Sequence, residues 1–175
     1  MGCHSSKGSE KESSIRYEFE MVEDEDVNKL FEEACEKFKS VENFRLAVTS
    51  FKENGFQLPS LENQRKVKIY IEAFKETPER LAIFSGLLES IELRIRERIK
   101  ILKHANNLSK IDKERVLRAC ESNLKAFAIE MRKVKRTEKI AAEAAEHATL
   151  LYEDLYANKG FFKSEESMSE TIFNH

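Results

Sequence analysis

The sequence contains few residues that interrupt helices. Its 175 residues include only 2 Pro and 5 Gly, and no Trp. Within residues 27–157 the breakers are Gly55, Pro59, Pro78 and Gly86, and three of these fall where a helix is expected to end or begin. Because Pro and Gly are costly inside helices and common at their ends, this distribution predicts an all-α chain.

Long apolar runs are also missing. No run approaches the roughly 20 apolar residues that a helix needs to cross a bilayer, and no apolar segment follows the N-terminus. We therefore expect neither a membrane-spanning helix nor a secretory signal. Charge is abundant instead, since Asp, Glu, Lys and Arg make up 35% of the chain. Leu, Ile, Val and Phe recur through most of the length, which predicts one folded domain with tails.

Cysteine is scarce and unpaired. Cys3, Cys35 and Cys120 are odd in number and widely spaced, and no C-x-x-C pair occurs. This excludes a disulfide framework and a zinc site of the usual spacing, so we expect reduced thiols. Cys35 and Cys120 fall on apolar stripes and are interpreted as small buried residues.

Patterns that carry catalysis are absent from the sequence. There is no glycine-rich phosphate loop and no Gly-x-Ser-x-Gly elbow. His147 follows Glu143 by one turn, but a bundle metal site needs Glu-x-x-His on two helices, and position 144 is Ala. We therefore expect no enzyme activity, no cofactor and no metal.

Apolar residues recur at three- and four-residue steps, which predicts amphipathic helices. A first helix, capped by Asp26 and ending near Asn54 and Gly55, carries the stripe Val27, Leu30, Phe31, Ala34, Phe38, Val41, Phe44, Val48 and Phe51. A shorter second helix is expected to begin at Ser60 and to close at Thr77. The same Thr77-Pro78 pair is expected to open a third helix, because Pro fits the first helical turn.

The third helix is expected to run from Pro78 to about residue 104, and Ser109 then caps a fourth helix of about 48 residues that ends before Gly160. The short turn at residues 105–109 makes these two helices antiparallel neighbours. The prediction is thus an all-α, elongated helical bundle with a long C-terminal helix in an antiparallel hairpin. By length, residues 138–157 extend beyond the third helix and are expected to pack on the first helix or on a second chain.

Composition divides the chain into three parts. Residues 1–25 begin with a segment rich in Ser, Gly and Lys and are interpreted as a flexible acylated tether. Residues 26–159 form the helical bundle. Residues 160–175 mix Ser with acidic residues and are interpreted as a disordered acidic tail.

The start of the chain carries the most specific motif. Met1-Gly2-Cys3 is followed by small or polar residues and by the hydroxyl of Ser6, as in N-myristoylated proteins, where Met removal exposes the amine of Gly2. One myristoyl chain binds a membrane only marginally, so a palmitate on Cys3 would supply the second signal. This segment resembles the dually acylated starts of Src-type kinases, G-protein α subunits and late-endosomal scaffold subunits. The resemblance covers about seven residues and implies lipidation at Gly2 and Cys3 only.

Charge is segregated along the chain. The first 60 residues carry 8 basic and 13 acidic residues, whereas residues 94–139 carry 15 basic and 6 acidic. The antiparallel hairpin should gather the basic residues that flank its turn at one end of the bundle. Such a basic tip suits an anionic lipid surface or an acidic partner, and the alternative is a solvated face balanced by the chain's own acidic segments. The candidate surface residues are Arg94, Arg98, Lys100, Lys103, Lys110, Lys113 and Arg118.

Together these features predict a lipid-anchored adaptor on the cytoplasmic face of a plasma membrane or endomembrane. It would recruit a protein partner through a helical surface, and it is a possible homo-oligomer. Two alternatives stay open: a membrane-shaping or self-assembling structural protein, analogous only in design to BAR-type and ESCRT-III-type hairpins, or a soluble coiled-coil subunit. No nucleic-acid partner is expected, because aromatic residues do not interleave the basic segment.

Overall fold

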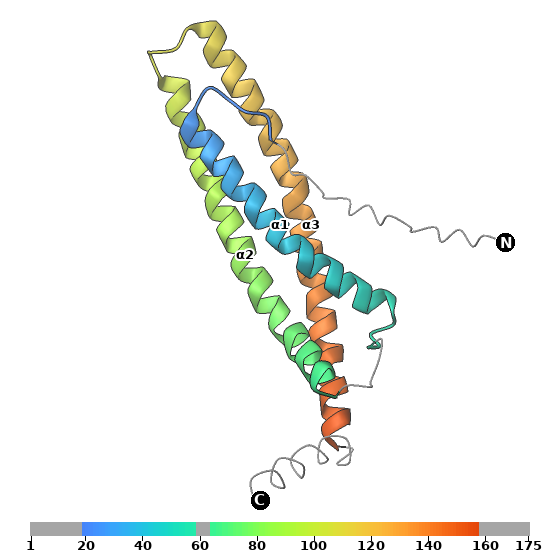
Figure 1. The fold of residues 1–175 in the computed structure, drawn as a ribbon. Coiled ribbons are helices and arrows are strands. Elements are labelled where there is room, and N and C mark those ends of the chain that lie inside the picture. Colours follow the sequence, from blue (N-terminus) through green and yellow to red (C-terminus); the bar gives the residue numbers. More distant parts are fainter. Residues whose placement is uncertain (1–18, 59–63, 158–175) are drawn as a thin grey trace, which may run out of the picture.

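Three helices build the structure, a computed structural model that describes residues 19–58 and 64–157. They are α1 (Glu25–Glu53), α2 (Gln64–His104) and α3 (Lys110–Ala157). The helices lie side by side along one long axis, with the α2–α3 turn at one end (Figure 1). α3 has 48 residues and is therefore about 70 Å long. This confirms the predicted all-α elongated bundle with its long C-terminal helix in an antiparallel hairpin.

One continuous core joins the three helices. Seven of the nine residues predicted for the first stripe are buried in α1, while Leu30 and Phe44 are partly buried. Phe38 of α1 meets Phe127 of α3 edge to face, with ring centroids 5.2 Å apart. α2 contributes five residues with no exposed surface: Ile71, Leu81, Leu88, Ile91 and Ile95.

The predicted boundary at Thr77-Pro78 is wrong, because α2 runs through it as one helix. Pro78 removes one backbone hydrogen bond and costs roughly 3 kcal/mol inside a helix. The buried stripe continues across the proline at three- and four-residue steps, however, from Ile71 through Phe74 and Thr77 to Leu81. Burial of each such side chain contributes about 1.5–3 kcal/mol, which outweighs the break. Thr77 is itself buried, and its hydroxyl donates to the carbonyl of Ala73 at 2.7 Å. Ser60, the predicted cap of the separate helix, lies outside the described residues.

The start of α1 also differs from the prediction. Asp24, not Asp26, is the N-cap, and its carboxylate accepts a hydrogen bond from the backbone amide of Val27 at 2.9 Å. Asp26 lies in the first turn and is exposed. Asp24 is better placed because its side chain can lie against α2 as well as cap α1.

The end of the predicted tether belongs to the folded domain, which corrects the boundary at residue 25. The ring of Phe19 packs on Phe31 with centroids 4.6 Å apart. The backbone of Glu20 exchanges two hydrogen bonds with the amide side chain of Asn123 on α3, at 3.0 and 2.7 Å. These contacts hold residues 19–24 against the bundle. The remaining tether residues, 1–18, and the predicted tail, 160–175, lie outside the described residues.

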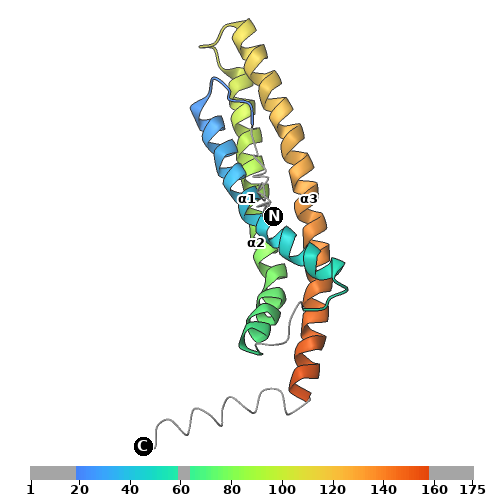
Figure 2. The ribbon, with the colours of Figure 1, turned by 45° about the vertical axis from the view of Figure 1, so that its right-hand side comes forward.

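The C-terminal end of α1 crosses toward α3 (Figure 2). Lys52 forms an ion pair with Glu143 at 2.5 Å, and Phe56 stacks on His147 with ring centroids 3.8 Å apart. The chain turns after α1 through Gly55 and Phe56, both with positive φ. Residues 138–157 of α3 therefore contact the end of the first helix, as one of the two predicted arrangements has it. The expected extension beyond α2 is wrong, however, because α2 begins at Gln64 and its Lys75 lies over the ring of Tyr152 near the end of α3.

The two described cysteines differ in their surroundings. Cys120 is fully buried in α3, and burial raises the pKa of its thiol to about 11. Cys35 is only half-buried, so the prediction of a buried small residue holds for Cys120 and not fully for Cys35. Burial also raises the pKa of Cys35. Cys3 lies outside the described residues.

Candidate functional site

The predicted lipidation residues, Gly2 and Cys3, lie outside the described residues. Among residues 19–58 and 64–157, no helix is long and apolar enough to cross a bilayer. The same residues contain no group of three or more His, Cys, Asp and Glu side chains able to hold a metal ion. The described part of the candidate site is therefore the basic end of the hairpin.

The turn between α2 and α3 brings this end together. Ser109 caps α3, because its hydroxyl accepts a hydrogen bond from the amide of Asp112 at 3.1 Å and donates to the Asp112 carboxylate at 2.6 Å. The ammonium of Lys113 donates to the backbone carbonyl of Lys103 at 3.3 Å, across the turn. The basic residues of the last turns of α2 and the first turns of α3 thus share one end of the bundle, as predicted.

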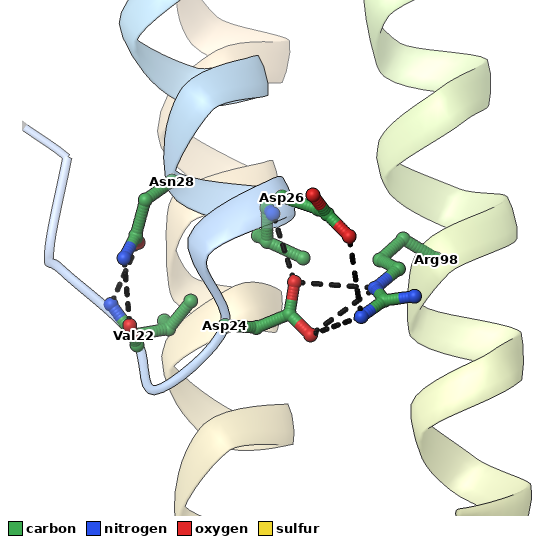
Figure 3. Close-up of polar contacts among 6 residues, drawn as sticks. Val22, Asp24, Asp26, Asn28 and Arg98 are labelled. Carbon is green, nitrogen blue, oxygen red and sulfur yellow. Dashed lines mark hydrogen bonds and ion pairs between the residues drawn. The ribbon is translucent and has the colours of Figure 1, made fainter.

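Arg98 points inward to the start of α1 (Figure 3). Its guanidinium donates to both carboxylate oxygens of Asp24, at 2.9 to 3.2 Å, and lies 3.4 Å from the carboxylate of Asp26. Burial raises the pKa of Asp24, but hydrogen bonds from Arg98 and from the Val27 amide, with the charge of Arg98, outweigh it and leave that pKa below its ordinary value. Arg98 therefore already has two carboxylate partners within the fold.

The other arginines near this end also have carboxylate partners. Arg94 of α2 pairs with Glu33 of α1 at 2.9 Å, and Arg118 lies 3.7 Å from Glu114. Arg115, which is not among the predicted surface residues, pairs with Glu23 from the segment before α1. The acidic residues that precede and begin α1 thus neutralise part of the basic end, which is the alternative that the sequence analysis left open.

The four predicted lysines behave differently from the arginines. Within the described ranges, none of Lys100, Lys103, Lys110 and Lys113 forms an ion pair with a carboxylate. Two large apolar side chains stand beside them in sequence, Ile101 with 59% and Ile111 with 79% of its surface exposed. We call these six residues the lysine tip: Lys100, Ile101, Lys103, Lys110, Ile111 and Lys113.

The two isoleucines of the lysine tip are not among the surface residues predicted from the sequence. The signal was present, since Ile101 and Ile111 fall outside the apolar stripes of their helices. Exposed apolar side chains beside basic residues also occur in helices that lie on membrane surfaces.

A second surface feature lies between α1 and α3. It is an open groove of about 420 Å³ lined by Glu42, Arg45, Thr49, Lys133, Arg136, Thr137 and Ile140. Arg45 pairs with Glu42, and Lys133 pairs with Glu130 at 2.7 Å, so much of the positive charge of the groove is balanced locally. The lysine tip is therefore the stronger candidate for an anionic ligand.

Comparison of the chain with family models, with curated proteins and with solved structures finds no match.

Proposed function

We propose that this protein is a lipid-anchored adaptor on the cytoplasmic face of a membrane. In this proposal acyl chains on Gly2 and Cys3 hold the protein at the bilayer, and the lysine tip makes a second contact with anionic headgroups. The observation that carries the proposal is that the four tip lysines form no ion pair within the described residues and stand beside two exposed isoleucines. The arginines around them are already neutralised by carboxylates of the same chain.

The length of chain before the folded domain allows both contacts at once. Residues 2–18 span at most about 60 Å when fully extended. The described chain begins beside Asn123 on α3, 13 residues and about 20 Å along the axis from the start of that helix at Lys110. An acyl chain on Gly2 can therefore reach the surface that the lysine tip touches.

The membrane-binding free energies of the acyl chain and of the lysines favour two contacts that act together. One myristoyl chain gives only marginal binding, whereas each Lys near an anionic leaflet adds about 1 kcal/mol at low salt. Insertion of Ile101 and Ile111 would add apolar burial without removing an ion pair from the fold. The tip can thus orient a protein that the lipids hold.

The adaptor role follows from confinement. A partner bound to a helical face of this protein would be held at the same surface, where its effective concentration rises without a new contact. The groove between α1 and α3 offers one such face, and Arg136 gives it a positive charge that suits an acidic segment.

The proposal is tested by cell fractionation of the untagged protein and its Gly2→Ala variant. The variant removes the geometry required for acylation, so it should move from the membrane fraction to the supernatant. A His4→Ala variant keeps Gly2, Cys3 and Ser6 and should stay with the membrane. Full membrane association of Gly2→Ala would contradict the lipid anchor, and full solubility of the unchanged protein would favour the soluble-subunit alternative.

The structural alternative, a protein that shapes membranes, is favoured by one observation. The hairpin is about 70 Å long and carries its unpaired lysines at one end. Electron microscopy of anionic liposomes separates the two functions. The adaptor leaves their shape unchanged, whereas a membrane-shaping protein converts them to tubes or coats them with polymers.

A further inference from the structure

One face of α2 has no partner within the described residues. α1 lies against one side of α2, where Arg94 pairs with Glu33, and α3 lies against another, where Glu89 meets Lys135 at 3.2 Å. Between these two sides, on the surface of α2 that points away from the core, exposed residues recur mostly at three- and four-residue steps. We call it the α2 outer face: Glu72, Glu79, Ala82, Ile83, Gly86, Leu87, Ser90, Leu93, Glu97 and Lys100.

The middle of this face is apolar. Ile83 and Leu93 expose 59% and 58% of their surface, and Leu87 exposes 41%. Three small residues, Ala82, Gly86 and Ser90, follow one another at four-residue steps between them. Small residues at this spacing allow the backbone of a second helix to approach closely, and the large apolar neighbours would then be covered.

Among the residues that the structure describes, none packs closely on Gly86. A Cβ atom built at this position meets nothing within 4 Å, so alanine would fit without any shift. Glycine inside a helix costs about 1 kcal/mol relative to alanine. The absence of a side chain is therefore useful only to something that approaches the helix from outside.

The charged residues on both sides of the apolar middle indicate which partner binds this face. We propose that α2 pairs with α2 of a second copy of this chain, in the antiparallel direction, with the two Gly86 residues at the crossing point. In that register Ala82 lies opposite the second copy's Ser90. Glu72 then lies opposite the second copy's Lys100, and Glu97 opposite its Lys75. Each of these contacts occurs twice, because the pair is symmetric.

The side chains at these positions are available for such contacts. Within the described ranges, Glu72, Glu97 and Lys100 form no ion pair in the single chain. Lys75 borders the outer face on the side of α3, where its ammonium lies over the ring of Tyr152, 4.6 Å from its centre. It would have to leave this ring to reach Glu97 of the second copy. A parallel arrangement is unfavourable, because each charged residue would then lie opposite the same residue of the second copy, and the like charges would repel each other.

The proposed interface is symmetric and stops at two copies. An isologous interface uses the same patch on both copies, so the product is a dimer and no filament grows through this face. The two lysine tips would lie toward opposite ends of the dimer, each beginning at Lys100, 14 residues and about 21 Å along α2 from Gly86. In the dimer Lys100 faces Glu72 of the second copy, so Lys103, Lys110 and Lys113 are the tip lysines left for an anionic surface. The dimer does not depend on the proposed membrane role, and its test is made without lipid.

Sedimentation equilibrium of the 175-residue chain made in bacteria, in the absence of lipid, tests the pairing. The unchanged chain should show twice its mass of 20.4 kDa. A Gly86→Gln variant should be a monomer, because the new side chain blocks the close approach. Gln is a better helix former than Gly, so at concentrations low enough for both chains to be monomeric the variant should not unfold at a lower temperature than the unchanged chain. Ala128→Gln adds the same side chain at an exposed position of α3 and should remain a dimer.

A charge exchange tests the direction. Glu72→Lys places two lysines opposite each other and should weaken the antiparallel dimer roughly tenfold, and Glu72→Lys with Lys100→Glu should restore it. A monomer for the unchanged chain at roughly 100 μM would overturn the proposal and leave the face to another protein. A dimer that survives Gly86→Gln would place the contact elsewhere and overturn it too. Failure of the exchange to restore the dimer would overturn the antiparallel register.

Discussion

The carboxylate of Asp24 caps α1 and at the same time holds Arg98 of α2, whose Nη2 lies 2.9 Å from Oδ2 (Figure 3). The Asp24 side chain is only 6% exposed and that of Arg98 is 34% exposed. The two residues are 74 positions apart in the sequence. One side chain therefore fixes both where the first helix begins and how it lies on the second.

Replacement of Asp24 should destabilise the domain, and two variants can separate the contribution of the helix cap from that of the ion pair. Asp24→Ala loses the cap and the contact with Arg98, and we expect it to lower the free energy of unfolding by about 2–3 kcal/mol, after allowing for the solvent that screens Arg98. Asp24→Asn keeps a side chain that caps equally well and should lose about half as much. Urea unfolding followed by circular dichroism measures both. An equal decrease in the free energy of unfolding for the two variants would contradict this division between the helix cap and the ion pair with Arg98.

Acid should reduce the contribution of Asp24. Its pKa in the folded protein lies below the ordinary value of 3.8, so the unfolded chain takes up its proton first as the pH falls. The contribution is therefore complete above about pH 4 and is lost as the pH falls through the folded-state pKa. Thermal unfolding at several pH values should show the gap between the unchanged protein and Asp24→Asn narrowing below pH 4. If the difference in unfolding temperature between the two proteins increased below pH 4, the lowered pKa of Asp24 would be contradicted.

Replacement of Pro78 tests the continuity of α2. In the middle of a helix, Pro78→Ala restores a backbone donor to the carbonyl of Phe74 and should raise the stability by about 1–3 kcal/mol. At a helix boundary the same change would be neutral or harmful, since Pro suits the first turn. Thermal unfolding of the variant distinguishes the two. Thr77→Val is a useful comparison, because it removes the hydroxyl bonded to Ala73 and leaves the proline.

The fold could be predicted largely from the sequence because each helix keeps its apolar stripe over many turns. Val27, Phe38 and Val48 were expected to be buried and are. The error at Pro78 came from giving a local breaker more weight than the stripe. Three- and four-residue steps connect Ile71 to Leu81 across it, and this spacing was visible in the sequence.

The candidate site could be predicted only in part. The antiparallel hairpin places Lys103 and Lys113 at the same end by local geometry alone. The neutralisation of Arg98 and Arg115 depends on carboxylates 74 and 92 positions away, which no local pattern reveals. Sequence reasoning therefore identified a basic end but not which of its cations remain unpaired.

Neutralisation of the lysine tip should weaken membrane binding without unfolding the domain. Replacement of its four lysines by Gln should lower binding to phosphatidylcholine vesicles that contain phosphatidylserine at least tenfold at low salt, and the difference should shrink as salt is added. Cosedimentation measures both effects. A control with Lys37, Lys39, Lys125 and Lys139 replaced by Gln has the same net charge and should bind as the unchanged protein does. Equal losses for the two variants would show that net charge, not the tip, governs binding.

The most direct test of the account is the intact mass of the untagged protein purified from eukaryotic cells, recorded before and after treatment with hydroxylamine. We predict loss of Met1, a stable increase in mass of one myristoyl group, and a further increase of one palmitoyl group that hydroxylamine removes. A chain that carries neither group would contradict the lipid anchor, which is the central claim.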